Sequence, residues 1–144
     1  LVTALRDQYS QLAESAQANT QIERLGESNT FTIITAHQPS LFTGPLYFII
    51  KICSTINLAR QLNERYPEQH FVPVFVTGGE DHDFEEINHL HLFGKTLEWQ
   101  NEESGAVGQM STDSLAAPLA ELKEILGDSE KAQTVYSDHE TGIA

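Results

Sequence analysis

The chain has 144 residues, enough for one domain with a hydrophobic core. Its formal net charge is −13, from 8 basic and 21 acidic residues. Binding to nucleic acid or to an anionic membrane draws on Lys and Arg, so the composition argues against both partners and is compatible with small-molecule substrates.

The sequence contains one cysteine, Cys53, so an internal disulfide is excluded. Because Cys53 falls in an apolar helical run, we expect a buried thiol that acts as a small hydrophobic residue; a nucleophilic cysteine is the alternative. Single-cysteine usage fits a reducing compartment, and no long uncharged stretch predicts a membrane span. We therefore expect a cytoplasmic protein.

The two ends of the chain suggest a fragment of a longer protein. The chain starts at Leu1 rather than at a methionine, and it stops in the polar stretch SDHETGIA, where we expect no closing helix or strand. A site completed by later residues would then be only partly visible.

The predicted elements alternate between helix and strand. Residues 1–25 have helical spacing, 26–29 are a break, 30–36 form a buried strand, and 45–65 form a helix that Pro67 ends. A second strand covers 70–79; Pro73 within it donates no ladder hydrogen bond and is expected at the strand's start.

The second half of the chain is predicted in shorter pieces. An acidic loop and short helix cover 80–88, short strands with a Phe-Gly-Lys turn cover 89–99, and 104–110 are a candidate to pair with those strands. Residues 112–128 predict a helix that ends at Gly127.

Strand, helix and strand form a βαβ unit, so the fold class is α/β with a parallel sheet and flanking helices. We divide the chain into an N-terminal helical segment, 1–29, and a core portion, 30–144. The carboxyl ends of parallel strands share one edge of the sheet, where ligands of open α/β sheets bind. The loops after the two strands, 37–44 and 77–83, should therefore meet.

The first loop runs into an almost wholly apolar helix that carries one lysine. Unpaired N–H groups at that helix's start, a close approach at Gly44, and polar side chains would suit a ligand. A lysine that extends along the surface to solvent is the alternative reading of Lys51. The candidate binding residues are His37, Gln38, Gly44, Pro45, Tyr47 and Lys51.

The second loop carries four acidic or imidazole side chains in a row, Glu80, Asp81, His82 and Asp83. We assign Glu80 to binding and Asp81, His82 and Asp83 to catalysis, because such a cluster can bind a metal, orient an amine or act as a general base. The alternative is a solvated helix N-terminus in which an aspartate is only the cap.

Other acidic and imidazole side chains are assigned to the surface. His89 and His91 share one face of a strand but lack a third ligand at matching spacing, so solvent-facing histidines are favoured over zinc. Glu85 and Glu86 are expected on the surface. No residue is assigned as a metal ligand, and whether the protein uses a metal is left unknown.

Two segments resemble a known family. AHQPSLFTGPLYFIIKICSTINLA and HFVPVFVTGGEDHDFEEINHLHLFG are similar to the cysteine-adding enzymes of bacillithiol biosynthesis, the BshC family, over about residues 30–110. Carried over by position, the motifs fall on Gln38, Gly44, Pro45, Tyr47 and Lys51, and on residues 80–87.

The resemblance implies a Rossmann-like core, here without the family's C-terminal coiled coil, and a homodimer in the full-length protein. It also implies a ligase that adds L-cysteine to glucosaminyl malate, with ATP or another nucleotide as the activating cofactor. Three alternatives stay open: a nucleotidyltransferase-like enzyme on another substrate, a metal-dependent hydrolase built on the acidic cluster, and a non-catalytic scaffold piece.

Overall fold

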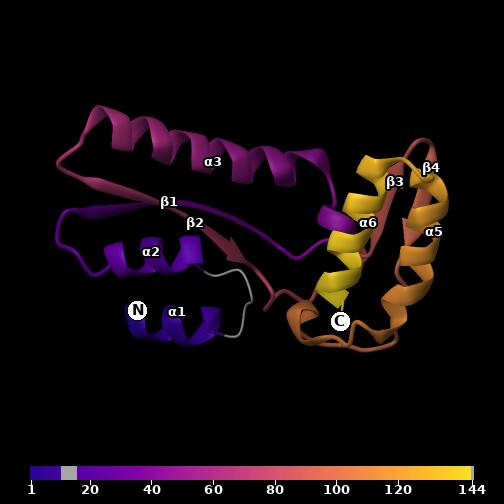
Figure 1. The fold of residues 1–144 in the computed structure, drawn as a ribbon. Helices are drawn as coiled ribbons and strands as arrows, with labels where there is room; N and C mark the ends of the chain where they lie inside the picture. Colours follow the sequence, from indigo (N-terminus) through magenta and orange to yellow (C-terminus); the bar gives the residue numbers. More distant parts are fainter. Residues whose placement is uncertain (11–15, 144) are drawn as a thin grey trace. The chain divides into compact units, whose positions relative to one another are not determined.

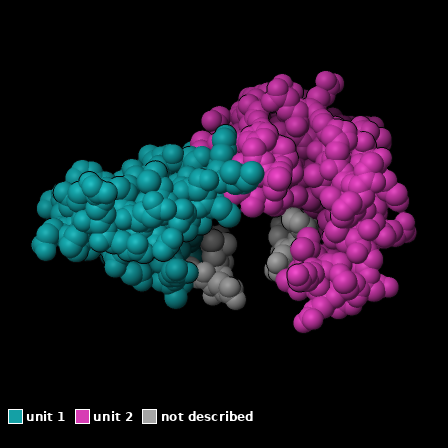
Figure 2. Space-filling view, turned by 90° about the horizontal axis from the view of Figure 1, so that it is seen from above, with its two compact units in different colours: residues 1–35, 50–76 teal, residues 36–49, 77–144 magenta. Residues whose placement is uncertain are grey.

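The computed structural model describes residues 1–10 and 16–143, with side chains to residue 137. The chain divides into two compact units (Figure 2): unit 1 comprises 1–35 and 50–76, and unit 2 comprises 36–49 and 77–144. The domain boundary expected at residue 29 stays a prediction.

Two parallel strands run through the centre of unit 1 (Figure 1). β1 (Thr30–His37) and β2 (His70–Thr77) form a two-stranded sheet. The N–H of His70 donates to the carbonyl of Asn29 at 3.0 Å, and the N–H of Gly78 donates to the carbonyl of His37 at 3.0 Å. Because the strands start together and end together, they are parallel, which confirms the predicted α/β class.

Helices lie on both sides of these strands (Figure 1). α3 (Leu46–Arg65) runs along one side, and α2 (Ala16–Arg24) lies on the other. Ile22 of α2, Ala59 of α3 and Val72 of β2 are all buried. The core of unit 1 therefore contains residues of α2, β2 and α3, because each helix covers one apolar side of the sheet.

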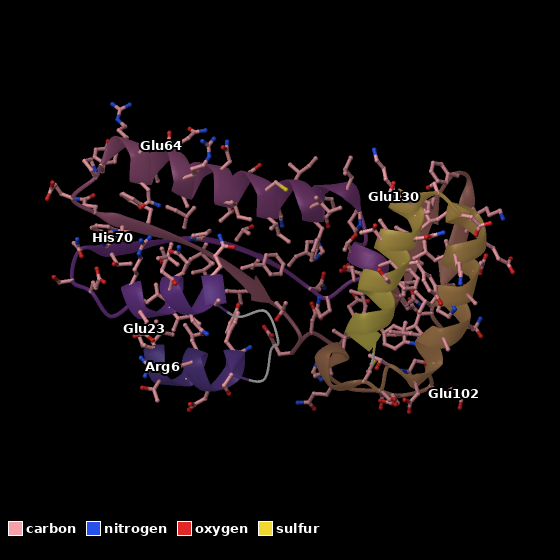
Figure 3. The ribbon with its side chains drawn as sticks, in the orientation of Figure 1. Arg6, Glu23, Glu64, His70, Glu102 and Glu130 are labelled. Atoms are coloured by element: carbon pink, nitrogen blue, oxygen red, sulfur yellow. The ribbon has the colours of Figure 1, made fainter. Side chains whose placement is uncertain are left out.

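The N-terminal segment forms two helices where the sequence predicted one. α1 (Val2–Tyr9) precedes α2, and residues 11–15 lie outside the described part of the chain. Arg6 and Glu23 point toward one another (Figure 3), with Arg6 Nη2 2.7 Å from Glu23 Oε1. Both side chains are more than half exposed, so this pair contributes little to stability.

Pro73 lies inside β2 and not at its start, so that expectation is wrong. The N–H groups of His70 and Gly78 point toward β1, so the even-numbered positions of the strand face its partner. The N–H groups of successive residues point to opposite edges of a strand. The nitrogen of Pro73, at an odd-numbered position, therefore faces away from β1. A proline is tolerated there because no ladder hydrogen bond is lost.

Cys53 is exposed, so the expected burial of its thiol is wrong. It lies on α3 among other exposed apolar residues, including Ile50 at 53% and Ile56 at 52%. A two-stranded sheet covers only one side of a helix, and the first half of α3 is apolar nearly all round. Its surplus apolar surface therefore remains in contact with solvent.

Unit 2 is built around one hydrophobic cluster. It contains the hairpin β3 (His89–Leu92) and β4 (Lys95–Glu98), the short α4 (Phe84–Ile87), and the helices α5 (Ala116–Leu126) and α6 (Glu130–Ile143). It also contains single 3₁₀ turns at Leu41–Thr43, Val107–Gln109 and Asp113–Leu115. Leu97 is completely buried, and the cluster around it includes Phe42, Trp99 and Leu122.

The predicted hairpin is confirmed. His89 pairs with Glu98, and Leu92 with Lys95, in antiparallel register. The turn between the strands has positive φ at both central residues, 49° at Phe93 and 78° at Gly94. That pattern belongs to the tight hairpin turns whose twist matches the strands. Gly127, with φ 70°, ends α5 as predicted.

Two expectations for unit 2 are wrong. Residues 104–110 do not pair with the hairpin; they form the turn at Val107–Gln109, which hydrogen-bonds to the loop after β2. The polar C-terminal stretch, expected without an element, lies in α6. α6 packs on α5 through the buried Ala132, and Lys123 Nζ lies 4.6 Å from the ring centroid of Tyr136. Tertiary contacts thus stabilise a helix whose polar sequence gives little indication of one.

Within the described residues, no helix combines the length and the apolar character needed to cross a membrane.

We predict that Asn63→Ala destabilises unit 1. Asn63 joins α3 to the outer edge of β2: its Oδ1 accepts from the N–H of Phe71 at 2.9 Å, and its Nδ2 donates to the carbonyl of Phe71 at 2.8 Å. Removing the amide leaves two half-buried backbone groups unsatisfied, which costs about 1–3 kcal/mol. Urea denaturation measures the change in the free energy of unfolding.

Gln61→Ala, at an exposed position of the same helix, is the control and should change stability by less than about 0.5 kcal/mol. Equal effects of the two substitutions would contradict the role of Asn63.

Candidate functional site

The loops that follow β1 and β2 meet within unit 2. The side-chain Nε2 of Gln38 donates to Asp81 Oδ2 at 2.6 Å, across 43 positions of sequence. Gly78 packs against the same residue, since a Cβ on Gly78 would lie 3.8 Å from the Cα of Gln38. The topology predicted this meeting of Gln38 with the acidic quartet, and the structure places the two together. Their catalytic and binding roles stay predictions.

Asp81 uses both of its carboxylate oxygens inside the protein. Oδ2 accepts from Gln38, while Oδ1 accepts from the backbone N–H of His82 at 2.7 Å and of Asp83 at 3.1 Å. The Gln38 amide, followed by the N–H of Asp83, lowers the pKa of Asp81 below its ordinary value. Asp81 is therefore a charged group that fixes the loop's conformation and is poorly suited to taking up a proton.

Glu86 takes part in the same arrangement. Gln38 Nε2 lies 3.2 Å from Glu86 Oε2, so one amide group bridges two carboxylates. Glu86 is exposed, as expected, but its contact with Gln38 was not predicted. From the sequence alone, a position of this short helix that faces the first loop could not be distinguished from one that faces solvent.

His37 orients the first loop. Its Nδ1 lies 2.9 Å from the carbonyl oxygen of Gln38, and because a carbonyl only accepts, Nδ1 carries the proton. In the neutral ring Nε2 then accepts from the hydroxyl of Tyr47, 2.7 Å away. Tyr47, His37 and the peptide of Gln38 therefore form a continuous chain that ends at the side chain bonded to Asp81.

The turn before α3 has an unusual backbone. Phe42, Thr43 and Gly44 have consecutive positive φ angles of 46°, 70° and 57°. A Cβ on Gly44 would lie 2.6 Å from the Cβ of Ser40, so only glycine fits. Phe42 is buried in the hydrophobic cluster, which stabilises this strained turn. Gly44 and the exposed Pro45 then lead directly into α3 at Leu46.

Three side chains of the acidic quartet are exposed: Glu80, His82 and Asp83. Within the part of the chain that the structure describes, no hydrogen bond or ion pair occupies these side chains. They are therefore available to a ligand, unlike Asp81.

Lys51 belongs to a different unit from the other candidates. It is exposed on α3 and belongs to unit 1, whereas the remaining candidate residues belong to unit 2. Its contribution to a site with those residues stays a prediction.

A third segment joins the site, and local sequence patterns did not predict it. The N–H of Val107 donates to the carbonyl of Asp81, and that of Gly108 to the carbonyl of Gly79, both at 2.8 Å. A Cβ on Gly108 would lie 2.9 Å from the Cα of Gly79, so the two backbones touch because both residues are glycines. The closely spaced glycines in GAVGQM were the available signal for such an approach.

The histidines of β3 lie side by side, with ring centroids of His89 and His91 5.2 Å apart. Nδ1 of His89 contacts Asn88 Oδ1, and Nδ1 of His91 contacts Thr96 Oγ1. Among the described residues, no three His, Cys, Asp or Glu side chains are grouped so as to hold a metal ion.

Comparison with known proteins identifies the family. Residues 1–143 match the family described as "Bacillithiol biosynthesis BshC, N-terminal Rossmann-like domain". The chain belongs to the BshC family. The fold is accordingly Rossmann-like, as the motif resemblance implied.

Several curated members of the BshC family are similar to this chain. Proteins named "Putative cysteine ligase BshC" from Christiangramia forsetii and Flavobacterium johnsoniae are 45% and 47% identical over 99% and 94% of the chain. The one from Flavobacterium psychrophilum is 48% identical over 94%. The matches cover 25–27% of these relatives, so the chain spans about a quarter of their length.

We predict that Gln38→Leu raises the pKa of Asp81 toward its ordinary value, because the largest stabilising contact of the carboxylate is lost. A folded-state pKa below the unfolded one contributes stability above the unfolded pKa, which is lost as the pH falls through the folded value. The variant should therefore lose less stability on acidification. Carboxyl ¹³C NMR titration of Asp81 measures the shift directly.

Gln100→Leu, at an exposed position on another loop, is the matched control and should leave the titration of Asp81 unchanged. An unchanged Asp81 pKa in Gln38→Leu would show that the hydrogen bond does not stabilise the carboxylate.

Proposed function

We propose that the full-length protein is a cysteine ligase that adds L-cysteine to glucosaminyl malate in bacillithiol biosynthesis. The names of the BshC relatives support a ligase, and the matching family is one of bacillithiol biosynthesis. The single structural observation that carries the proposal is the Gln38–Asp81 hydrogen bond, which fixes two polar loops at the carboxyl ends of parallel strands.

In this reaction the glucosamine nitrogen attacks the carbonyl carbon of an activated cysteine. The carbon–nitrogen bond forms, the activating group leaves with its electron pair, and the nitrogen loses a proton. An ammonium ion is not a nucleophile, so a base must accept that proton. ATP or another nucleotide would supply the activation of the cysteine carboxylate.

His82 and Asp83 are the proposed proton acceptors and amine-binding groups. Both side chains are exposed, and Asp81 holds their backbone N–H groups in place. Asp81 itself, with both oxygens occupied, acts as a positioning residue. Of the three residues assigned to catalysis from the sequence, His82 and Asp83 are therefore the proposed reacting groups, and Asp81 fixes the loop that carries them.

The start of α3 is proposed to bind an anionic part of the substrate. Helix N-termini present unpaired backbone N–H groups and a positive dipole end. Gly44 and Pro45 precede this helix, and the hydroxyl of Tyr47, in its first turn, is oriented by His37. Lys51, one turn further, is proposed to add a positive charge.

We also propose that the protein acts in the cytoplasm as a homodimer, on small molecules. A biosynthetic route to a small thiol suits a compartment where thiols stay reduced. The homodimer rests on the family resemblance, and light scattering of the full-length protein tests it.

We predict that His82→Ala and Asp83→Ala each lower product formation by about 10²–10⁴-fold, the usual contribution of general acid–base catalysis. The assay incubates the full-length protein with cysteine and glucosaminyl malate, with and without ATP, and detects bacillithiol by mass spectrometry. Glu85→Ala, an exposed acidic residue beside the cluster, is the control and should retain activity.

Wild-type turnover in both His82→Ala and Asp83→Ala would contradict these residue roles. Absence of bacillithiol from the unmodified full-length protein, with and without ATP, would contradict the proposed reaction itself.

A further inference from the structure

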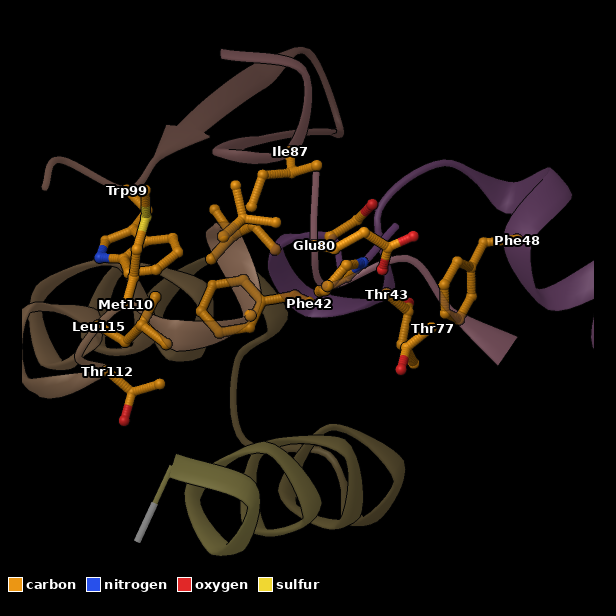
Figure 4. Close-up of a pocket in the computed structure, with 16 residues that line it drawn as sticks. Phe42, Thr43, Phe48, Thr77, Glu80, Ile87, Trp99, Met110, Thr112 and Leu115 are labelled. Carbon is orange, nitrogen blue, oxygen red and sulfur yellow. The ribbon is translucent and has the colours of Figure 1, made fainter. Parts of the chain in front are cut away.

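A cavity of about 730 Å³ opens beside the candidate site, wholly within unit 2 (Figure 4). The loop after β1 contributes Pro39 to Thr43, and the end of β2 contributes Thr77, Gly79 and Glu80. Its size falls within the range of about 300–1,000 Å³ that small-molecule sites usually occupy. Of the residues assigned to binding or catalysis from the sequence, only Glu80 lines it.

The cavity has mostly apolar and aromatic walls. Trp99, Met110 and Leu115 group at one end, with Phe42 between them and the opposite end, where Phe48 lies (Figure 4). Aromatic rings and a methionine sulfur favour contact with a flat ring through stacking and sulfur–aromatic interactions. A sugar carrying two carboxylates would find few polar partners on these walls.

Contacts within the protein hold the wall on the Trp99 side in place. The indole Nε1 donates to Ser114 Oγ at 2.7 Å, and the ring packs edge-on against Phe84 with centroids 5.0 Å apart. The contact between Gly79 and Gly108 fixes another part of the lining. The cavity is therefore a preformed shape, which lowers the entropic cost of binding.

The charge of the lining restricts the kind of polar group that the ligand can carry into the cavity. Among the residues that the structure describes, Glu80 is the one charged residue in the lining, and no lysine, arginine or histidine lines the cavity. The carboxylate of Glu80 lies at the same end as Thr43, Thr77 and Phe48 (Figure 4). An anionic group inside would be repelled, whereas an amino group would donate a charge-assisted hydrogen bond to Glu80.

We propose that this cavity binds an uncharged aromatic ring that carries an amino group, with the amino group donating to Glu80 and the ring against Phe42 and Phe48. Phosphates or carboxylates attached to such a ring would stay outside the cavity, because its walls offer them no cation. The proposal rests on the proposed function in one respect: the base of an activating nucleotide would be a ring of this kind.

Adenosine and inosine test the proposal, because inosine replaces the amino group of adenosine with a carbonyl oxygen on nearly the same ring system. Isothermal titration calorimetry of the full-length protein should give a dissociation constant at least about tenfold lower for adenosine, since one charge-assisted hydrogen bond is at stake. Glu80→Gln should remove most of this preference. Glu85→Gln, which alters a neighbouring exposed carboxylate outside the cavity, should retain it.

A dicarboxylate such as malate should not displace adenosine. Three results would overturn the proposal: no adenosine binding, as expected if another part of the full-length protein fills the cavity; equal affinity for adenosine and inosine; or an unchanged preference in Glu80→Gln. All of these are binding measurements without turnover, so they separate a failure of this proposal from a failure of the ligase assignment.

Discussion

The hydrogen bond between Gln38 and Asp81 is the contact on which the candidate site depends. It joins two loops that are 43 positions apart, and it occupies the oxygen of Asp81 that the backbone of the second loop leaves open. Because Asp81 also accepts from the N–H groups of His82 and Asp83, it determines where their side chains can be presented. The charged carboxylate of Asp81, held by three hydrogen bonds, therefore stabilises the conformation of the loop.

The backbone around this contact is equally constrained. The loop after β1 has three consecutive residues with positive φ, and burial of Phe42 offsets the strain. The loop after β2 is supported from the other side by the backbone of Val107 and Gly108. Three segments distant in sequence thus hold the exposed side chains of Glu80, His82 and Asp83 on a fixed base. Such preorganisation is what substrate positioning requires.

The polar loops and the apolar cavity offer two different chemistries next to each other. The exposed imidazole and carboxylate suit an amine that must lose a proton, whereas the aromatic walls suit a flat, uncharged ring. Glu80 belongs to both, since it starts the acidic quartet and also lines the cavity. This division between neighbouring subsites would suit the proposed ligase, which would bring together an amino sugar, an amino acid and an activating group.

The sequence by itself determined the α/β class, the parallel strands, the β3–β4 hairpin and the meeting of the two loops. These follow from local patterns, namely β-branched runs, helical spacing, a Phe-Gly turn, and the rule that parallel strands end at one edge. Its two motifs also indicated the BshC family, which the comparisons confirm.

Only the tertiary structure decided which group each polar side chain contacts. Asp81 and Asp83 look equivalent in sequence, yet one is fully hydrogen-bonded and the other is exposed, because Gln38 reaches only the first. The turn at Val107–Gln109, the position of Pro73 within its strand and the exposure of Cys53 were misjudged for the same reason. Each depends on which neighbour the folded chain supplies, and local pattern carries no information about that neighbour.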